Sequence, residues 1–444
     1  MKKILLVLLA IIVAAIIGGC IYLNTLMPII TGYAAKNLAS AVFISGREPA
    51  DVEALDLNFS FIKYNKNTVD YEAKTVTSRF LWAKSTAVFR EGYGVTLLRG
   101  KKVDELKAEK FPLPPAEAIP ERLEKADPAI IERLEPIAKA YVDDQSYGGV
   151  PFALVVLHDG KIAAERYREG LGPDTKFLSW SMSKSFTQAL TGIMAGDRIV
   201  NINAPMNLPQ WMNDGRKAIT LNNLLRMQAG LEWNENYGNR SDVNLMLHRE
   251  KDMGLYATLK PLSDEPGTKW LYSSGSINIV MRYLRAQFPS DKEFQQYMRD
   301  RLFTPLGISE YYFEPDLSGM PVGSSYLYVT ARDYARFGQM YLQDGCVPIE
   351  NGLLRVLPKG WVEYTTTPTE GSEGRYGSGF WINSSLRLPD VPADTFSCQG
   401  HDGQEILIIP SKNMVVVILG FTHMGGERFP IFNALLSDLV AALE

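Results

Sequence analysis

A serine followed three residues later by a lysine occurs twice in this chain of 444 residues, and such a pair can support acyl transfer. A serine hydroxyl is a weak nucleophile until a neighbouring base accepts its proton. A lysine assists only when its pKa falls from about 10.4 toward neutrality, through burial or a neighbouring cation. A tyrosinate stabilised by that lysine would serve equally well. Two matches are about what chance gives, so the motif alone does not identify a site. Activation of the serine needs a third group, which we expect on another segment.

The two pairs differ in their predicted local structure. Ser60 and Lys63 lie in an alternating, strand-like stretch, where positions three apart point to opposite faces. Ser181 and Lys184 begin a segment in which apolar residues recur at helical spacing until a glycine ends it. Positions i and i+3 share one face of a helix, and a helix N-terminus offers free N–H groups. We therefore expect the second pair to carry the chemistry.

The elements that position these residues belong to an ordered globular chain. An apolar content of 46% and a charged content of 22% exclude a disordered or collagen-like chain. With 46 basic and 50 acidic residues, the net charge of −4 gives no overall basic field, so we expect no nucleic-acid partner. Four histidines and three cysteines are too few for a rich metal site, and we predict no metal or other cofactor.

Residues 1–24 are predicted to be a membrane anchor or signal segment. Lys2 and Lys3 precede an uncharged, mostly apolar run over residues 4–23, which can just cross a hydrocarbon core of about 30 Å. Basic residues on the N-terminal side keep that end in the cytoplasm, so the bulk of the chain lies outside it, at the inner membrane or in the periplasm. An uncleaved anchor, a cleaved signal peptide and a lipoprotein signal with its lipid on Cys20 all stay open.

After this segment, we predict a small N-terminal extension over residues 25–110 and a main domain over residues 120–444, joined by a proline-rich stretch. Segments of the extension are rich in valine, threonine and aromatic residues, and are predicted to be strands. In an oxidising compartment Cys346 and Cys398 could pair, but two separate buried thiols are an equal alternative.

The main domain is predicted to be α+β. Asp127 and Pro128 open a helix, and a β-hairpin follows that turns at Asp159-Gly160. A mostly helical stretch separates this hairpin from three strand-like runs at residues 376–382, 405–409 and 414–419, and a last helix covers about residues 430–443. This order predicts one five-stranded antiparallel sheet flanked by helices, plus a mostly helical lobe.

Three segments together resemble the motifs of the serine β-lactamase and penicillin-binding protein superfamily. They read Ser-Met-Ser-Lys-Ser-Phe-Thr at 181–187, Tyr-Ser-Ser at 272–274 and His-Asp-Gly at 401–403, in the order and at the spacing of that family. The nearest resemblance is to its class C-like branch of esterases, D-aminopeptidases and 6-aminohexanoate-dimer hydrolases, over about residues 120–444. The resemblance implies a β-lactamase/transpeptidase-like fold and a serine hydrolase.

Roles follow from the matched positions. The resemblance implies that Ser181 is the acylated nucleophile and Lys184 its proton partner. Tyr272 would be the general base for acylation and would then help to deliver water to the acyl-enzyme. The backbone N–H groups of Ser181 and Gln404 would form the oxyanion hole, aimed at the developing negative charge.

Two positions depart from the lactamase pattern. Ser274 stands where lactamases and penicillin-binding proteins carry an asparagine that hydrogen-bonds the substrate amide. His401 stands where penicillin-binding proteins have the lysine of Lys-Thr-Gly, and Gly403 lets the substrate backbone approach that strand. With these replacements the site is less suited to penicillins, so simple esters or amides are the better candidates.

The sequence therefore predicts a membrane-attached serine hydrolase outside the cytoplasm that cleaves a small ester or amide. A β-lactamase or D,D-peptidase acting on cell-wall-type substrates stays an alternative, as does a non-catalytic binding protein on the same fold. An α/β-hydrolase triad is excluded because the sequence has no Gly-x-Ser-x-Gly elbow, and metal hydrolysis because it has no His-Glu-x-x-His motif.

Overall fold

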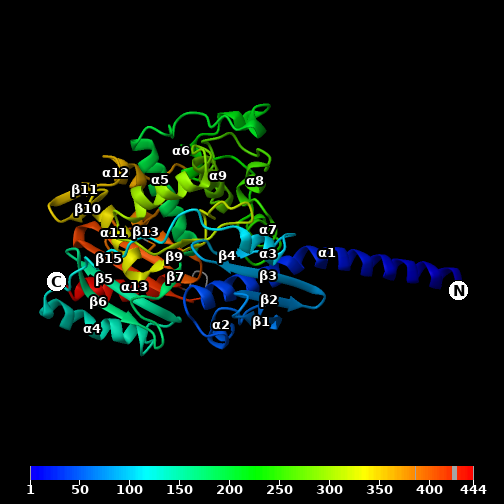
Figure 1. Cartoon of the computed structure of the whole chain (residues 1–444), viewed down its shortest axis with the longest axis horizontal. Coiled ribbons are helices and arrows are strands. Elements are labelled where there is room, and N and C mark those ends of the chain that lie inside the picture. The colour runs from blue at the N-terminus through cyan, green and yellow to red at the C-terminus, as the bar shows by residue number, and fades with distance from the viewer. Residues whose placement is uncertain (1, 386, 423–427, 444) are drawn as a thin grey trace. The chain divides into compact units, whose positions relative to one another are not determined.

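The computed structural model describes residues 2–385, 387–422 and 428–443. The chain divides into two compact units. Figure 1 colours the chain by residue number, from blue at the N-terminus to red at the C-terminus. The N-terminal unit comprises residues 1–110 and 234–251, and the C-terminal unit comprises residues 111–233 and 252–444.

In the N-terminal unit, one long helix packs against a four-stranded antiparallel sheet. The helix is α1 (Lys2–Phe43), and the sheet has the order β1 (Lys66–Asp70), β2 (Thr75–Phe80), β3 (Ala83–Arg90), β4 (Gly94–Leu97). Three short helices complete the unit: α2 (Pro49–Leu55), α3 (Val103–Ala108) and α7 (Asp242–Arg249). Helix α1 is buried over residues 31–41 and exposed over residues 3–22, so its apolar first half has no protein covering within the unit.

The strand predicted around Ser60 and Lys63 is wrong. Ser60 has a φ of 44°, and a 3₁₀ turn follows at Ile62–Tyr64. The side chain of Asn65 donates hydrogen bonds to the carbonyls of Ile62 (2.9 Å) and Ile30 (3.4 Å). These bonds close a turn against α1, which the alternation of side chains along the sequence does not reveal.

The C-terminal unit is built on an antiparallel sheet of six strands, not five as the sequence predicted. Its order is β12 (Trp381–Ile382), β13 (Phe396–Gln399), β14 (Glu405–Ile409), β15 (Met414–Gly420), β5 (Pro151–His158), β6 (Lys161–Tyr167). The predicted run at 376–382 shrinks to the two-residue edge strand β12. Strand β13 was not predicted, because four residues reading Phe-Ser-Cys-Gln carry too few apolar side chains to stand out.

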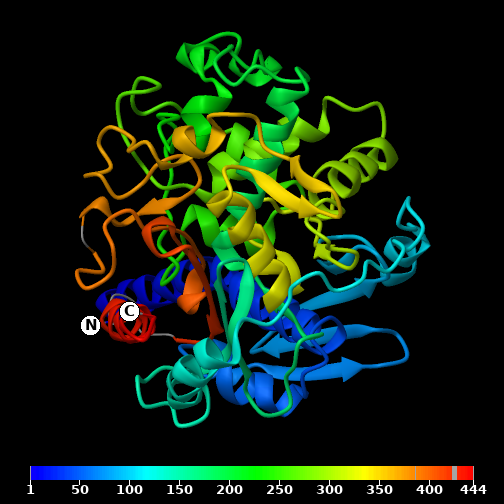
Figure 2. The same ribbon diagram turned by 90° about the vertical axis from the view of Figure 1, so that its left-hand side faces the viewer.

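Helices cover both faces of this sheet (Figure 2). On one face, α4 (Pro128–Val142) and α13 (Arg428–Ala441) share a buried apolar core with alternate residues of β5, β14 and β15. On the other face lies α11 (Ala331–Leu342), which approaches so closely that a Cβ on Gly338 would lie 2.6 Å from Val415 Cγ1. The predicted α+β arrangement is confirmed, with a sheet packed between helices.

The remaining helices and two small sheets form the predicted helical lobe. The helices are α5 (Ser183–Gly196), α6 (Leu221–Leu225), α8 (Met253–Thr258), α9 (Ser274–Arg285), α10 (Asp291–Met298) and α12 (Trp361–Thr366). One small sheet has the order β7 (Lys176–Leu178), β9 (Leu327–Thr330), β8 (Tyr312–Phe313), and β10 (Cys346–Ile349) pairs with β11 (Gly352–Arg355). Cys346 and Cys398 are both buried and free, so the second of the two alternatives for these thiols holds.

Candidate active site

Ser181 lies at a sharp turn between strand β7 and helix α5. The preceding residue, Trp180, has a φ of 44°, a conformation that is rare for a bulky side chain and costs backbone strain. The turn is held from both sides: Ser179 N–H donates to Leu327 O (2.8 Å), and the Ser183 hydroxyl donates to Trp180 O (3.0 Å). This bend presents Ser181, partly exposed, at the start of the helix.

Lys184 lies one helical turn beyond Ser181, as predicted, and is almost fully buried, with 1% exposure. Its Nζ donates hydrogen bonds to Ser181 Oγ (2.8 Å) and to the backbone carbonyl of Ser324 (3.1 Å). The same Nζ lies 5.0 Å from the centre of the Tyr272 ring. The structure thus brings together the three residues that the sequence predicted to be catalytic.

Tyr272 is positioned by the segment that begins helix α9. The Ser273 hydroxyl accepts a hydrogen bond from Ser276 N–H (3.0 Å) and caps the helix, while Leu271 N–H donates to Met227 O (2.8 Å). These two hydrogen bonds hold the chain on either side of Tyr272, whose side chain is partly exposed. Ser274, which was predicted to face the substrate, is fully buried in the first turn of this helix.

The third predicted motif forms the turn between β13 and β14. Asp402 and Gly403 have φ values of 58° and 89°, which allow the chain to reverse within five residues. Gln404 ties the turn to β15, since its Oε1 accepts from Gly420 N–H (3.2 Å) and its Nε2 donates to Gly420 O. The turn is therefore fixed to the central sheet.

This turn packs directly against the segment that leads to Ser181. A Cβ added to Gly400 would lie 2.5 Å from the carbonyl oxygen of Ser179, so only glycine permits this approach. The His401 ring lies edge-on to Trp180 with 5.6 Å between ring centres, and its Nε2 is 3.3 Å from Asp402 Oδ1.

The two N–H groups predicted to form an oxyanion hole carry no protein acceptor. Within the described residues, no hydrogen bond is formed by the backbone N–H of Ser181 or by that of Gln404. Unpaired N–H groups beside a nucleophile can donate to an oxygen atom of a bound ligand.

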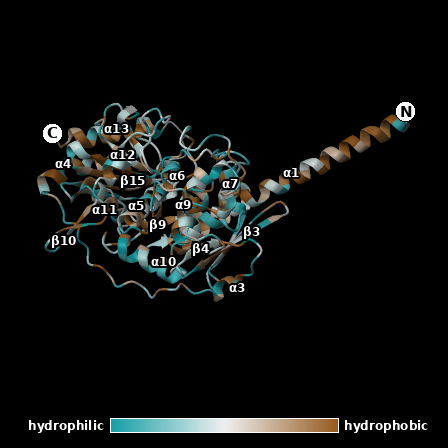
Figure 3. Ribbon diagram, turned by 90° about the horizontal axis from the view of Figure 1, so that it is seen from above, coloured by the Kyte–Doolittle hydropathy of each residue, from teal (hydrophilic) through white to brown (hydrophobic). Residues whose placement is uncertain are grey.

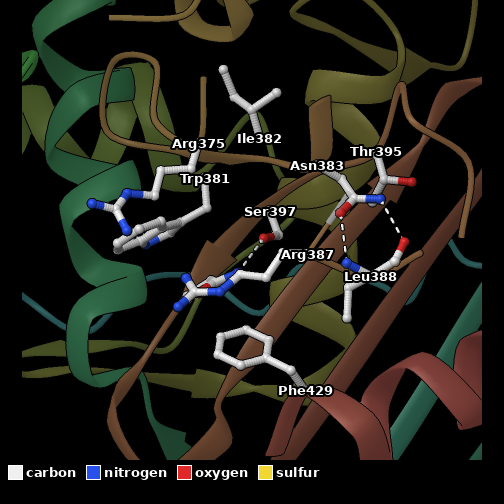
Figure 4. A pocket seen from close by; sticks show the side chains of 10 residues that line it. Arg375, Trp381, Ile382, Asn383, Arg387, Leu388, Thr395, Ser397 and Phe429 are labelled. Atoms are coloured by element: carbon white, nitrogen blue, oxygen red, sulfur yellow. Dashed lines mark hydrogen bonds between the residues drawn. The ribbon is translucent and has the colours of Figure 1, made fainter. Parts of the chain in front are cut away.

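A cavity adjoins this site on the side of Tyr272. Trp381 lines the cavity and contacts the Tyr272 ring with 5.4 Å between ring centres. Besides Trp381, the lining of the cavity includes Arg375, Arg387 and Ser397. Figure 4 shows these side chains around one space.

The electrostatic character of this cavity is positive. Partial burial, together with the nearby cations of Arg428 and Arg375, lowers the pKa of Arg387. The guanidinium of Arg387 lies over the Phe429 ring at 4.1 Å, and that of Arg375 lies over Trp270 at 5.2 Å. Arg375 also lies 3.6 Å from the exposed carboxylate of Glu373. A planar guanidinium has five N–H donors, more than one such pair uses.

Glu405, the first residue of β14, is buried behind the predicted oxyanion residue. Its side chain is 1% exposed, and among the described residues neither carboxylate oxygen accepts a hydrogen bond. Arg428 Nε is 3.9 Å from Oε1. Burial raises the pKa of Glu405 to about 8, against an opposing effect of Arg428 and Arg387.

Sequence reasoning missed several groups of the site. The carbonyl of Ser324 carries no side-chain signal, and Arg375 and Arg387 come from loops without a motif. Glu405 gave one signal, because a carboxylate opens an otherwise apolar strand directly after the third motif. The neighbouring aromatic residues Trp381 and Phe380 differ, because Trp381 lines the cavity whereas Phe380 is buried in the core.

Among the described residues, no group of three or more histidine, cysteine or acidic side chains is arranged to hold a metal ion. The arrangement instead combines a nucleophile, a buried amine, a phenol and two donor N–H groups.

The family model described as Beta-lactamase matches residues 134–435. The 6-aminohexanoate-dimer hydrolase of Paenarthrobacter ureafaciens is 25% identical over 300 residues, which cover 60% of this chain and 71% of that protein.

Two solved structures share the fold. One is a Bacillus anthracis protein provisionally named a 6-aminohexanoate-dimer hydrolase, with a TM-score of 0.61 and 23% identity, covering 74% of this chain and 90% of that one. The other is a family VIII carboxylesterase, with a TM-score of 0.54 and 15% identity over 71% of this chain and 98% of that one.

The burial of Glu405 predicts a specific pH dependence of stability. Because its pKa is raised from 4.5 to about 8, the folded state keeps a proton that the unfolded chain releases between these values. This group therefore favours folding fully below about pH 4.5, and its contribution is lost as the pH rises toward 8. Thermal unfolding of Glu405→Gln at pH 5 to 9 should show a smaller loss of stability with rising pH than the wild type. The exposed Glu132→Gln should keep the wild-type slope, and equal slopes for Glu405→Gln and wild type would contradict the account.

Proposed function

The chain belongs to the beta-lactamase family of serine hydrolases, and from this premise we propose that it cleaves small esters or amides through an acyl-enzyme formed on Ser181. The observation that carries the proposal is the hydrogen bond from the buried Lys184 Nζ to Ser181 Oγ, with the Tyr272 ring beside the same amine.

Acylation begins when Ser181 Oγ attacks the carbonyl carbon of the substrate. The hydroxyl proton passes to Tyr272, the general base, whose phenolate form is stabilised by the nearby Lys184. The bond to the leaving group then breaks, and the leaving alcohol or amine departs with that proton. The product of this step is an ester between Ser181 and the acyl group.

The negative charge that develops on the carbonyl oxygen needs fixed donors. The unpaired N–H groups of Ser181 and Gln404 supply them, as an oxyanion hole does. The hydrogen bonds between Gln404 and Gly420 support this role, because they fix the turn before the reaction begins. His401 and Gly403 line the approach of the substrate along the same turn, and Ser274 supports Tyr272 from the buried first turn of α9.

Hydrolysis of the acyl-enzyme completes the cycle. Tyr272 accepts a proton from water, and the resulting hydroxide attacks the acyl carbon. The Ser181–acyl bond breaks, and Ser181 Oγ takes back the proton that Tyr272 received from water. The carboxylic acid then leaves. No cofactor takes part in either step.

The arginine-lined cavity favours a substrate that carries an anionic group. Trp381 connects the cavity to Tyr272, so a substrate held at Ser181 can extend into it. Arg375 and Arg387 would pair with a carboxylate there through charge-assisted hydrogen bonds. The proposed substrates are therefore small esters or amides with a carboxylate on one side of the scissile bond.

We also propose that the N-terminal segment attaches the enzyme to a membrane, with the hydrolase outside the cytoplasm. Residues 3–43 form a helix long and apolar enough to cross a bilayer, with a mean hydropathy of 3.2 in its most apolar window. The lysines at its start favour an orientation with the N-terminus in the cytoplasm. A lipid on Cys20 would attach the chain to the same membrane.

Kinetics of three variants test the assigned roles. With a chromogenic ester, Ser181→Ala and Lys184→Ala should each lower kcat by roughly 10³-fold or more, because each removes a group of one catalytic unit. Tyr272→Phe should lower it by about 10² to 10⁴-fold through the loss of proton transfer.

The second serine–lysine pair offers a matched control. Ser60→Ala and Lys63→Ala make the same changes at the same spacing in the N-terminal unit, and both should keep wild-type activity. Near-full activity of Ser181→Ala would contradict the mechanism. A β-lactam or a cell-wall D,D-dipeptide turned over faster than any ester or amide would favour the alternative activity on the same fold.

Substrate preference tests the cavity. Two esters are compared that differ only at one end, where one carries a carboxylate and the other a methyl group. Arg375→Gln should lower kcat/KM for the charged ester by roughly 10-fold, because a charge-assisted hydrogen bond is lost. The kcat/KM for the neutral ester should not change. The exposed Arg133→Gln should change neither. An equal loss for both esters would exclude anion binding by Arg375.

A further inference from the structure

The turn between strands β2 and β3 carries two strongly exposed apolar side chains. Leu81 is 66% exposed and Trp82 is 56% exposed. The 3₁₀ turn beside it adds Phe61 and Tyr64, which are 60% and 58% exposed. Phe61 and Phe80 bring the two turns together, with 6.3 Å between their ring centres. We call Phe61, Tyr64, Leu81 and Trp82 the aromatic tip.

The aromatic tip lies where α1 leaves the unit. Trp82 Nε1 donates a hydrogen bond to Asn24 Oδ1 (2.8 Å), at the end of the exposed apolar stretch of the helix. Asn65, next to Tyr64, donates to the carbonyl of Ile30 in α1 (3.4 Å). Figure 1 and Figure 3 both show the β2–β3 turn beside the part of α1 that extends away, and Figure 3 shows how apolar that part is.

The geometry of α1 sets the level of this tip relative to a bilayer. The exposed stretch over residues 3–22 has 20 residues, so at about 1.5 Å per residue it spans about 30 Å, the thickness of a hydrocarbon core. Asn24 and Trp82 then lie at the level of the lipid headgroups. Tryptophan and tyrosine are the residues preferred at this level of a membrane.

A row of basic side chains follows directly behind the tip. Lys66 pairs with Arg79 across β1 and β2, and Arg79 pairs with Lys84 across β2 and β3. All three are exposed. Like charges side by side in a sheet repel one another, and an anionic surface relieves that repulsion. The acidic residues Asp70 and Glu72 lie at the opposite end of β1.

We propose that the aromatic tip and this basic row dock onto the outer surface of the membrane that α1 enters, with the rings between anionic phospholipid headgroups. The inference rests on the proposed membrane attachment. It assigns the N-terminal unit a function, which is to hold the chain on the bilayer at a second point beside α1. Cleavage or lipidation at Cys20 would leave the tip and the row intact, because both lie further along the chain.

Fluorescence quenching in vesicles tests this docking. Trp82 is the one tryptophan among the 7 of the chain that lies in the N-terminal unit. The full chain is reconstituted into vesicles of phosphatidylcholine and phosphatidylglycerol, with or without phosphatidylcholine brominated near the top of its acyl chains. Bromine should quench a component of the emission in the wild type, and Trp82→Phe should lose that component. Equal quenching of the wild type and Trp82→Phe overturns the proposal. The absence of quenching in the wild type also overturns it, and is the result expected if a second copy of the chain covers the aromatic tip.

A second comparison isolates the basic row. A triple variant, Lys66→Gln with Arg79→Gln and Lys84→Gln, should weaken the quenching of Trp82 in vesicles containing phosphatidylglycerol and leave it unchanged in pure phosphatidylcholine. Lys74→Gln, at the opposite end of the sheet, should behave as the wild type. A triple variant equal to the wild type in both lipids overturns the role of the row.

Vesicle flotation separates this inference from the proposed attachment. If the wild-type chain does not float with vesicles, the membrane attachment is wrong and the docking falls with it. If it floats without quenching specific to Trp82, the attachment stands and the docking alone is wrong. Far-ultraviolet circular dichroism of each variant checks that the fold is kept, which the exposure of all substituted side chains favours.

Discussion

The hydrogen bond between the buried Lys184 amine and the Ser181 hydroxyl is the interaction on which the site depends. An amine taken out of water requires polar partners, and Lys184 bonds the hydroxyl at one helical turn and the carbonyl of Ser324. That carbonyl is itself held in place, because Asn278 of α9 bonds the amide N–H and the hydroxyl of Ser324. The nucleophile therefore takes its position from the core of the helical lobe.

The central sheet contributes the other half of the site through close packing. The turn at residues 400–404 touches the segment before Ser181 because Gly400 has no side chain to keep them apart. The same turn is bonded to β15 through Gln404, so it cannot move away without breaking buried hydrogen bonds. A serine that follows a strained residue, beside two fixed N–H groups, has the geometry that a preorganised acyl-transfer site requires. In the proposed function, substrate selection depends on the loops that carry Arg375 and Arg387, as is usual where one fold serves many substrates.

Much of this arrangement could be predicted from the sequence, and the exceptions have physical causes. Helical spacing placed Lys184 beside Ser181, a Pro after an Asp marked the start of α4, and an apolar run gave β14 its observed bounds. Strand β13 could not be predicted, because its pairing with two longer neighbours, and not its own composition, makes it a strand. The turn at Ser60 is set by side-chain hydrogen bonds from Asn65, which local alternation does not encode. Arg375 and Arg387 reach one cavity because the loops on either side of β12 fold toward it, and no spacing in the sequence indicates this.

Covalent labelling shows whether Ser181 is an activated nucleophile. The full chain, solubilised in detergent, is treated with a fluorophosphonate and its intact mass is measured, with Ser181→Ala in parallel. If Ser181 is activated, the wild-type chain takes one adduct and Ser181→Ala takes none. The control Ser60→Ala should still take one. An adduct that persists on Ser181→Ala would place the reactive group at another residue. A folded wild-type chain that takes none would favour a binding protein on this fold, and either result would contradict an activated Ser181.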